Sequence, residues 1–418
     1  MPHMSNYSRG SALLLSRLQS SLAQRREQQL LRTHLVRANA DQVTMSVDGE
    51  ELLGFCSNDY LGLANHPDVI AALQKGARDY GVGSGASHLI TGHCRVHDQL
   101  SEELAAFTGR EKALLFCSGY MANVGVINAL TEPGGLVLQD ALNHASLLDG
   151  GWLSRGRSIR YAHSDTDSLE LELRQAAAAP SRLIVTDGVF SMDGDRAPLA
   201  LLADIADEHR AALMVDDAHG LGVLGKNGSG TVSAAGLSQA QVPILIGTLG
   251  KAFGTAGAFV AGDAVLIDYL AQFSRTYVFT TAMPPALAEA TRASLKLVVG
   301  EQWRRERLQQ LISGFRRVAA ELGLVVLPSD TPVQAVMMGS AEQAVRASQL
   351  LRAHGVQVSA IRPPTVPQGQ SRLRITLSAA HSDEQLDRLL HALESVQRNL
   401  LSMDQPVAMA QAGREVRI

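Results

Sequence analysis

The chain has 418 residues and 46% of them are hydrophobic, so it is long enough to bury a large core and to form more than one domain. Charged residues make up 19% of the chain and the formal net charge is -4, which argues against a protein whose overall charge attracts nucleic acid or anionic lipid. The cysteines, Cys56, Cys94 and Cys117, lack the spacing of a disulfide framework or a zinc site, and they fit a reducing cytoplasm.

The N-terminal segment is predicted to be an arm outside the core. Residues 11 to about 40 combine helical spacing with a high density of charge, which is typical of an amphipathic helix. Arg17 interrupts the short apolar patch near the start, so we expect no signal peptide. No apolar run reaches the roughly 18 residues needed to cross a bilayer, so we expect a cytoplasmic protein without a membrane partner. We assign residues 1–57 to this arm and its helix.

Residues 58–285 alternate short apolar runs with helical patterns. The runs are rich in Val, Ile and Leu and end in Gly, Ser, Asp or Thr, a rhythm that predicts βα units. The expected fold class is therefore α/β, with a large and mostly parallel sheet covered by helices on both faces. The runs lie at 113–117, 136–138, 182–186, 212–215, 243–246 and 258–262.

The pattern changes after Pro284 and Pro285. A long helical stretch leads to shorter apolar runs and then to a helix that we expect to end near residue 398. This order predicts a smaller α+β domain over residues 286–398, and residues 399–418 are expected to form a frayed tail. The predicted strands of the smaller domain are VVLP, AVMMG, VQVSAI and RLRITL.

Side chains that bind ligands or titrate follow five of the apolar runs. Because ligands bind outside the carboxyl ends of the strands in an open parallel sheet, we expect these side chains to share one basin. They are Ser118, Gly119 and Tyr120; Asp140, Asn143 and His144; Asp187 and Ser191; Asp216 and His219; and Thr248 and Lys251.

Each of these residues has an alternative interpretation when it is taken alone. Lys251 could be a solvated loop residue, and His144 and His219 could be structural histidines. Asp216 directly follows a buried run, however, and an unpaired buried carboxylate is costly, so a cationic partner is expected. The glycines around Lys251 would leave room for a ligand to approach the backbone.

The turn at Ser118 and Gly119 could be a plain turn or the start of a phosphate site. A helix N-terminus after a glycine turn presents free N–H groups and a positive dipole end to an anion. The glycines of the chain match neither the Rossmann fingerprint nor the P-loop, so a plain nucleotide-binding module is not supported. Pyridoxal phosphate would use every group in the basin, because it needs a Schiff-base lysine, an acid for its ring nitrogen and a phosphate cup.

Seven motifs along the chain together resemble one family. They are FCSNDYLGL, SGYMAN, NHASLLDG, TDGVFSMDGD, VDDAHGLGVLG, TLGKAFG and RLRITLSAAH, in this order. This combination resembles the α-oxoamine synthases, fold-type I pyridoxal phosphate enzymes that condense an amino acid with an acyl thioester and release CO2. The resemblance covers residues 11 to 398 and implies a fold-type I transferase with a seven-stranded sheet in the large domain.

The resemblance implies a role for each cofactor-binding residue. Lys251 matches the Schiff-base lysine, and Asp216 matches the partner of the ring nitrogen. His219 matches the donor to the ring's phenolic oxygen, and His144 matches the imidazole stacked on the ring. The phosphate is expected at Ser118, Gly119 and Tyr120, with Ser191 and Thr248 nearby. Thr280 and Thr281 match hydroxyls that reach the phosphate of the neighbouring subunit, which implies a homodimer with shared sites.

The resemblance also implies substrate contacts. Arg374 matches the arginine that pairs with the carboxylate of the amino acid, and Arg32, Asn58 and Thr365 match further substrate-contacting positions. The chain departs from the family at residues 85–86, where Gly-Ala stands in place of the paired glycines that relatives often have.

Residues 360–381 narrow the expected substrate. They are most similar to family members that join L-alanine to a pimeloyl thioester in biotin biosynthesis. Members that use glycine and a short acyl-CoA, such as 2-amino-3-ketobutyrate ligase, share the same catalytic residues and stay as the alternative. A non-catalytic scaffold subunit would typically lack the lysine. The sequence leaves open whether the acyl group arrives on CoA or on acyl carrier protein.

Overall fold

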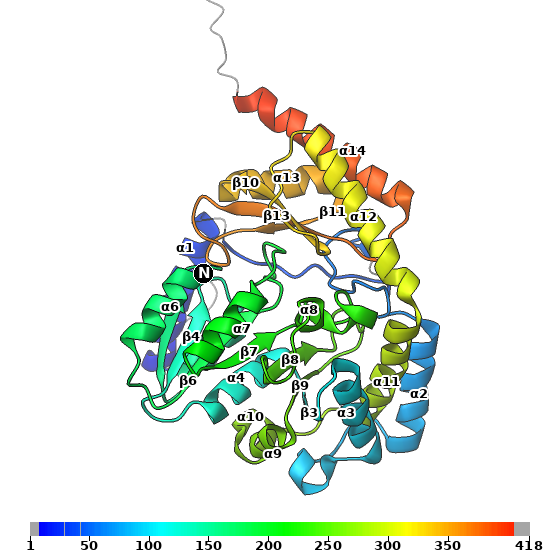
Figure 1. The fold of residues 1–418 in the computed structure, drawn as a ribbon. Helices are drawn as coiled ribbons and strands as arrows, with labels where there is room; N and C mark the ends of the chain where they lie inside the picture. Colours follow the sequence, from blue (N-terminus) through cyan, green and yellow to red (C-terminus); the bar gives the residue numbers. More distant parts are fainter. Residues whose placement is uncertain (1–7, 29, 42, 405–418) are drawn as a thin grey trace, which may run out of the picture.

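The computed structural model describes residues 8–28, 30–41 and 43–404 (Figure 1). A large sheet with its helices forms the lower part of the molecule in Figure 1, and a smaller sheet with α12 (Gln302–Glu321), α13 (Ala341–Ala353) and α14 (Asp383–Asp404) lies above it. None of the described helices is both long and apolar enough to span a bilayer.

The large sheet has seven strands and is mostly parallel, as predicted. Its one reversed strand is β9, which runs antiparallel to both of its neighbours, whereas the other strand pairs are parallel. The strands across the sheet are β3 (Lys112–Phe116), β9 (Ala258–Gly262), β8 (Ile244–Thr248), β7 (Ala212–Asp216), β6 (Arg182–Asp187), β4 (Leu136–Asp140) and β5 (Arg157–Tyr161).

Helices cover both faces of this sheet because successive strand residues point to opposite sides. In β4, Leu136 and Leu138 pack into one apolar cluster, whereas Val137 packs into the cluster on the other face. The Val137 face is covered by α4 (Gly119–Leu130), α5 (Ala145–Leu153), α9 (Ala264–Phe273) and α10 (Arg275–Val278), and the other face by α6 (Thr166–Gln175), α7 (Leu199–Glu208) and α8 (Gly230–Ala234).

The smaller sheet has the order β10 (Val333–Gly339), β13 (Ser371–Thr376), β12 (Ser359–Ile361) and is antiparallel. The predicted strand VVLP is wrong, because Val326 makes only an isolated bridge to Val336. Pro328 lacks the N–H that a ladder needs, which explains why no strand forms there. The long helical stretch divides at Gly300 into α11 (Pro285–Gly300) and α12, and α14 continues to Asp404, beyond the expected end near residue 398.

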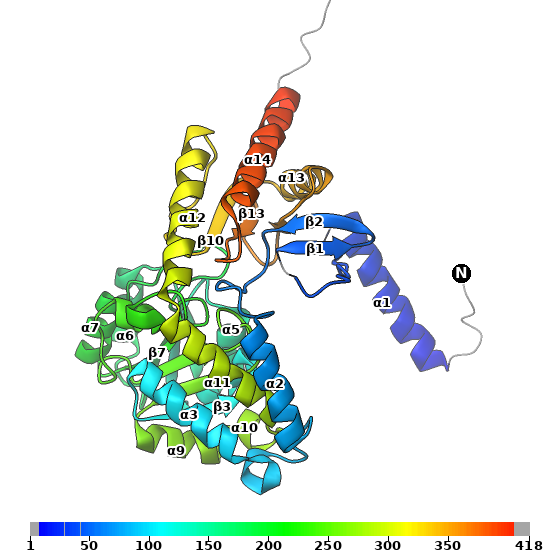
Figure 2. The same ribbon diagram turned by 90° about the vertical axis from the view of Figure 1, so that its right-hand side faces the viewer.

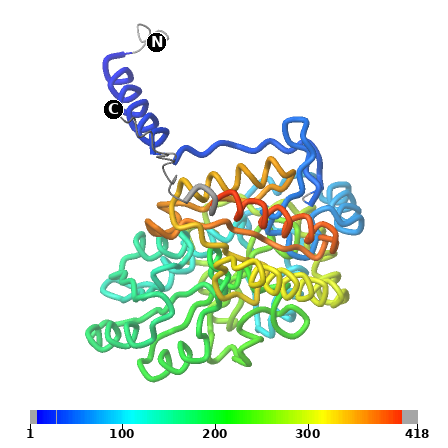
Figure 3. The backbone as a smooth tube through the Cα atoms, turned by 90° about the horizontal axis from the view of Figure 1, so that it is seen from above, coloured from blue at the N-terminus to red at the C-terminus, as the bar shows by residue number. Residues whose placement is uncertain are grey.

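The N-terminal segment contains two strands that the sequence analysis missed, β1 (Thr44–Val47) and β2 (Glu50–Gly54). The strand β2 pairs in parallel with β11 (Val356–Gln357), so this segment is tied to the C-terminal part. The helix α1 (Arg9–Glu27) buries none of its residues and projects from the body of the molecule (Figures 2 and 3). The division of the chain at residues 57, 285 and 398 stays a prediction, and residues 405–418 of the expected tail lie outside the described residues.

Candidate functional site

Lys251 lies in the short connection between β8 and the reversed strand β9. Its Nζ atom is 2.8 Å from Nε2 of His219. Burial lowers the pKa of the Lys251 amine from 10.5 to about 8, and the opposing charges of Asp216 and Asp187 only partly offset this effect. The amine therefore loses its proton much more readily than an ordinary lysine does.

The glycines around Lys251 serve packing more than ligand access, which corrects our expectation. A Cβ atom on Gly247 would lie 2.4 Å from the ring of Phe259, and one on Gly254 would lie 2.3 Å from the backbone nitrogen of Ala64. Gly254 also has a φ of +64°, in the left-handed region that favours glycine. Of the three, Gly250 alone has room beside it, because a Cβ atom there would come no closer than 3.5 Å to another atom.

Asp216 is the last residue of β7, and its two carboxylate oxygens are held by different donors. The backbone N–H of Ala218 donates to Oδ1 at 3.0 Å, and the side-chain amide of Asn123 donates to Oδ2 at 2.6 Å. Asp216 also lies beside Asp187 in the register of β6 and β7. Burial, together with the charge of Asp216, raises the pKa of Asp187, so one charge is kept at this point of the sheet.

His144 caps the N-terminus of α5 and faces the same edge of the sheet. Its backbone N–H donates to Asp187 Oδ2 at 2.6 Å, and its Nδ1 atom lies 2.7 Å from the hydroxyl of Ser146. Burial lowers the pKa of the His144 imidazole, although the charge of Asp216 acts in the opposite direction. The ring is therefore neutral near pH 7, as a ring that stacks on a cationic heterocycle should be.

A chain of hydrogen bonds connects Lys251 to Arg374 in the smaller sheet. His219 Nδ1 is 2.6 Å from the hydroxyl of Tyr60, and this hydroxyl donates to Asn58 Oδ1 at 3.2 Å. Arg374 donates to the same Asn58 oxygen at 3.1 Å from Nη2 and to the carbonyl of Ser191 at 2.6 Å from Nε. Burial lowers the pKa of His219 well below its usual value, and the nearby Lys251 adds to this effect. The imidazole is thus a neutral link between two cations.

The predicted phosphate end is built at the start of α4. The Ser118 hydroxyl accepts from the N–H of Met121 at 3.2 Å, and the N–H groups of the first helical residues, Gly119 and Tyr120, have no partner within the helix. A Cβ atom on Gly119 would lie 2.7 Å from Thr248 Cγ2, so only glycine lets the turn approach the end of β8. The geometry brings Ser118, Gly119 and Thr248 together as predicted, whereas the Tyr120 hydroxyl points to Asp149.

Of the predicted substrate residues, only Thr365 lines a pocket of about 490 Å³ beside this basin, and Arg32 reaches it through a hydrogen bond to Thr365, whereas Asn58 and Arg374 are not part of the lining. Arg32 donates from Nη2 to the hydroxyl of Thr365 at 2.9 Å, although the two residues lie far apart in the sequence. Thr365 lines the pocket together with Asn143, the neighbour of His144. The apolar part of the wall is formed by Leu142, Leu148, Phe190, Met192, Pro363, Pro364, Val366 and Pro367.

Thr280 and Thr281 lie after α10, and the carbonyl of Thr281 accepts from Sγ of Cys117, the neighbour of Ser118, at 3.3 Å. Thr281 is exposed and forms an isolated bridge with Ser87, and the next N–H, of Ala282, donates to Ala86 at 3.0 Å. The loop at residues 85–87, where Gly-Ala replaces the paired glycines of relatives, therefore packs against the segment that carries these threonines. Gly85 has a φ of +73° there, and a short π-helix, His88–Gly92, follows it.

Comparison with known proteins identifies the family. Residues 50–393 match the family described as aminotransferase class I and II. The chain belongs to this family. It is 56% identical to the 8-amino-7-oxononanoate synthase of Thioalkalivibrio sulfidiphilus, over 91% of this chain and 97% of that protein.

Two solved structures share the fold of this chain. A serine palmitoyltransferase from S. paucimobilis with bound PLP superposes with a TM-score of 0.89 at 29% identity, over 93% of this chain and 99% of that one. The 8-amino-7-oxononanoate synthase from Francisella tularensis superposes with a TM-score of 0.73 at 31% identity, over 84% of this chain and 99% of that one. These matches confirm the predicted fold-type I architecture.

The basin fits the cofactor of this aminotransferase class, pyridoxal phosphate. Lys251 offers an amine of lowered pKa, Asp216 offers an oriented carboxylate, and the start of α4 offers N–H groups to an anion. A side chain at Gly119 of this anion-facing turn would displace Thr248, because its Cβ atom would lie 2.7 Å from Thr248 Cγ2. The individual roles of these residues stay predictions.

Three functional candidates escaped the sequence analysis: Tyr60, Asn123 and Ser146. Tyr60 and Asn123 stand inside motifs that carry the family resemblance, but neither follows a predicted strand. Asn123 is a polar side chain in a mostly apolar stretch, whereas Tyr60 has other polar residues, Asn58 and Asp59, directly before it, so neither has a distinctive sequence signal. All three are buried, so their hydrogen-bonding groups had to find partners within the protein.

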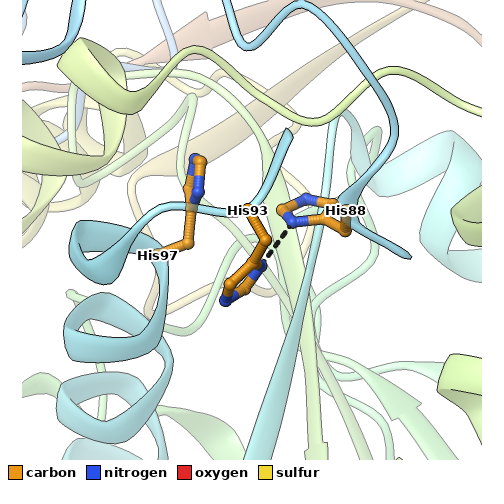
Figure 4. A group of neighbouring side chains, drawn as sticks. All are labelled: His88, His93 and His97. Carbon is orange, nitrogen blue, oxygen red and sulfur yellow. Dashed lines mark hydrogen bonds between the residues drawn. The ribbon is translucent and has the colours of Figure 1, made fainter. Parts of the chain in front are cut away.

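A cluster of three histidines, His88, His93 and His97, lies outside the basin (Figure 4). His88 and His93 are joined through their Nδ1 atoms at 2.7 Å, and His93 Nε2 donates to Asp98 at 2.8 Å. The His97 ring stands apart from this contact in Figure 4, and both of its nitrogens are used by backbone groups, the N–H of Cys94 and the carbonyl of Met283. A metal bound at His97 would have to break the cap of α3 (Arg95–Thr108), so the cluster is better explained as packing.

Proposed function

We propose that this chain condenses L-alanine with a pimeloyl thioester to give 8-amino-7-oxononanoate, CO2 and a free thiol, in biotin biosynthesis. The observation that carries the proposal is the convergence of Lys251, Asp216, His219 and His144 at the carboxyl ends of adjacent strands. Curated relatives that are 55% to 57% identical over at least 90% of this chain bear the name of that activity, which supports the choice of reaction.

Pyridoxal phosphate, when bound, supplies an aldehyde that joins an amine and a ring that accepts electrons. Lys251 would carry it and, with a pKa of about 8, would take up and return a proton near neutral pH at Nζ. Asp216 would keep the ring nitrogen protonated, since its oxygens accept hydrogen bonds and its charge favours a cation. His144 would cover one face of the ring as a neutral imidazole.

The residues of the smaller sheet would bind the amino acid. The guanidinium of Arg374 is held by Ser191 and Asn58, which fixes a planar group suited to a carboxylate. His219 would donate from Nε2 to the phenolic oxygen of the cofactor once the Lys251 amine has moved away and the Tyr60 hydroxyl has turned from Asn58 to donate to Nδ1, which leaves the ring proton on Nε2. Tyr60 would keep the His219 ring in place through Nδ1.

The pocket beside the basin would take the acyl chain. Its apolar wall suits the methylene groups of a pimeloyl chain, and the hydrogen-bonded pair of Arg32 and Thr365 offers polar groups at the pocket for the distal carboxylate. The cis peptide bond between Pro363 and Pro364 belongs to this wall. A short acetyl group would leave most of this volume unfilled, which favours the pimeloyl reaction over the glycine and acetyl-CoA alternative.

The working unit would be a cytoplasmic homodimer. Thr281 is exposed, as a hydroxyl offered to a neighbouring subunit should be, and large apolar side chains are exposed on the two segments that its bridge to Ser87 joins. They include Ile90 at 75% and Phe279 at 70% exposure, and such surfaces mark interfaces. The cysteines Cys56, Cys94 and Cys117 are all free thiols, which suits a reducing compartment. Acyl carrier protein stays a second candidate for the acyl donor.

The test is thiol release and product formation with four donor–acceptor pairs. L-alanine and glycine are each combined with pimeloyl-CoA and acetyl-CoA, and pimeloyl carrier protein is added as a fifth donor. We expect turnover with L-alanine and a pimeloyl donor to exceed the other pairs by at least about a hundredfold in kcat/KM. Preferred use of glycine with acetyl-CoA would contradict the proposal and favour the activity of a 2-amino-3-ketobutyrate ligase. No turnover with any of the pairs would favour the non-catalytic scaffold subunit.

A further inference from the structure

The amide of Asn123 joins two parts of the basin that otherwise have separate supports. Its Nδ2 atom donates to Asp216 Oδ2 at 2.6 Å and to the hydroxyl of Ser146 at 2.8 Å. The Ser146 hydroxyl in turn lies 2.7 Å from Nδ1 of His144. An unbroken chain therefore runs from the carboxylate of Asp216 to the imidazole of His144, and Asn123 and Ser146 are almost fully buried along it.

The direction of every hydrogen bond in this chain is set by Asp216. A carboxylate only accepts, so the Asn123 group that faces it must be the NH2 group and not the carbonyl. The second hydrogen of the same NH2 group then points at Ser146, whose oxygen accepts it. The Ser146 hydroxyl consequently keeps its own proton for His144 Nδ1, which also faces the Ser146 backbone N–H at 3.3 Å.

His144 Nδ1 is thus surrounded by donors and must be the unprotonated nitrogen of the ring. The proton of the neutral imidazole belongs on Nε2, and the lowered pKa of His144 agrees with a ring that carries only one proton. The arrangement also has a cost. The Oδ1 atom of Asn123 is buried without a hydrogen-bond partner among the described residues. This cost is offset by the two hydrogen bonds that the NH2 group of the same amide donates to Asp216 and Ser146.

We propose that Asn123 is a positioning residue that, through Ser146, couples the carboxylate of Asp216 to the tautomer of His144. The ionised carboxylate orients the amide, the amide orients the Ser146 hydroxyl, and the hydroxyl holds the imidazole as the Nε2–H tautomer. The proposal rests on the proposed function only for the roles of Asp216 and His144 in binding the cofactor. The tautomer itself is a property of the protein without any ligand.

The first test measures the tautomer in the cofactor-free protein. Nitrogen-15 spectra of histidine-labelled protein distinguish Nδ1–H from Nε2–H, and His144→Gln assigns the signal. We expect wild type to show the Nε2–H form. Ser146→Ala and Asn123→Leu, which keeps the forked shape of the side chain but has no donor, should each raise the Nδ1–H fraction. Asn128→Ala is the matched control. The amide of Asn128 also links α4 to α5, at Gly150, but it takes no part in the hydrogen bonds between Asp216 and His144.

The second test changes Asp216, at the far end of the hydrogen-bond chain from His144. In Asp216→Asn the new amide no longer dictates the orientation of Asn123, so the His144 tautomer should shift although His144 and Ser146 are unchanged. In a Ser146→Ala background the same substitution should add nothing. Wild-type His144 signals in both Ser146→Ala and Asp216→Asn would overturn the proposal, even if Asn123→Leu failed to fold.

The third measurement is the dissociation constant for pyridoxal phosphate, followed by absorbance. Asn123→Leu removes a donor from Asp216 and should weaken binding by roughly tenfold to a hundredfold, whereas Ser146→Ala should weaken it less. Equal affinities in wild type, Asn123→Leu and Asn128→Ala would contradict the role of Asn123 at Asp216. These readouts do not need turnover, so a failure of the proposed reaction would appear separately, in the assay with four donor–acceptor pairs.

Discussion

Lys251 Nζ and His219 Nε2 lie 2.8 Å apart, and the charge of the lysine lowers the affinity of the imidazole for a proton. Burial is the main cause of the lowered pKa at both residues, and the charge of Lys251 is the second cause at His219. A protonated amine and a protonated imidazole cannot coexist there at low cost. Near neutral pH the pair therefore carries a single proton, on the Lys251 amine, and the lowered pKa of that amine would suit the proposed role in covalent attachment and proton transfer.

Replacing Lys251 by Ala should abolish turnover. Both the covalent attachment of the cofactor and the proton transfer are lost, so we expect kcat/KM to fall by at least about a thousandfold. The purified variant should also lack the imine absorbance of the wild type. Lys226→Ala, on the loop after β7, is the control and should keep both properties. Turnover at the wild-type rate in Lys251→Ala would contradict the proposed function.

The rate at which the cofactor-free protein captures pyridoxal phosphate should depend on the protonation of Lys251. Only the neutral amine reacts, and with a pKa of about 8 the rate should rise about tenfold per pH unit below that value and level off above it. Stopped-flow absorbance from about pH 6 to about pH 10 gives the profile. A rate that kept rising through pH 10 would show an ordinary lysine with its usual pKa.

Replacing Tyr60 by Phe should lower kcat without changing the fold. The substitution removes only the hydroxyl between His219 and Asn58, so the imidazole loses one of its two supports. A lost hydrogen bond at this position corresponds to roughly a tenfold decrease in kcat. Steady-state kinetics check this, with Tyr80→Phe on the exposed end of α2 (Pro67–Tyr80) as the control. Equal kcat values would show that Tyr60 only packs.

Replacing Arg374 by Lys should raise the KM for L-alanine by roughly tenfold to a hundredfold. The charge is kept, but the planar fork that Ser191 and Asn58 hold is lost. Affinity for pyridoxal phosphate should change little, because Arg374 belongs to the smaller sheet. Titration with L-alanine followed by absorbance checks this, and Arg317→Lys on α12 is the control. A larger loss of affinity for pyridoxal phosphate than for L-alanine would contradict the proposed role of Arg374 in binding the amino acid.

Replacing His163 by Asn should destabilise the fold in a pH-dependent manner. Burial alone would lower the pKa of His163, but hydrogen bonds to Asp140 and Asp195, each 2.9 Å long, outweigh it and raise the pKa to about 10. The pKa is therefore higher in the folded than in the unfolded state. The contribution of His163 to stability is complete below about pH 6.5 and is lost as the pH rises toward 10.

Urea unfolding at several pH values measures this effect. We expect His163→Asn to lose on the order of 1–3 kcal/mol near pH 6, because two charge-assisted hydrogen bonds disappear, and progressively less toward pH 10. His391→Asn on α14 is the control. A loss of the same size at every pH would mean that the imidazole acts by packing against Phe190 and not by its charge.

The predictable part of the site consists of residues that follow strands. Asp216 and Lys251 could be placed because an apolar run marks a buried strand and the next polar residue must lie at its end. Tyr60 could not be placed in this way, because its contact with His219 joins positions 159 residues apart. Asn123 escaped for a related reason, since a polar residue within an apolar helix shows that a partner exists but not which one it is.

The fold, like the site, was predictable in part from the sequence. Runs rich in Val, Ile and Leu became strands of the large sheet, whereas β5 escaped because only Ile159 and Tyr161 of its residues are apolar at this edge of the sheet. The glycines near Lys251 were misinterpreted because a sequence shows that a side chain is absent but not what occupies the space. At Gly254 that space is filled by the backbone of Ala64.

Arg374 lies in a strand of the smaller sheet and Lys251 follows a strand of the large sheet, and the amino acid would have to touch both. An amino acid between them would therefore act as a bridge between two layers of the molecule, whereas the cofactor would rest on one layer alone. Any small sliding of β13 over the Ser191 loop would change how tightly the amino acid is gripped and leave the cofactor undisturbed. Selectivity for the amino acid would then depend on how the smaller sheet packs against the large domain, and substitutions at that contact, far from the basin, could alter it.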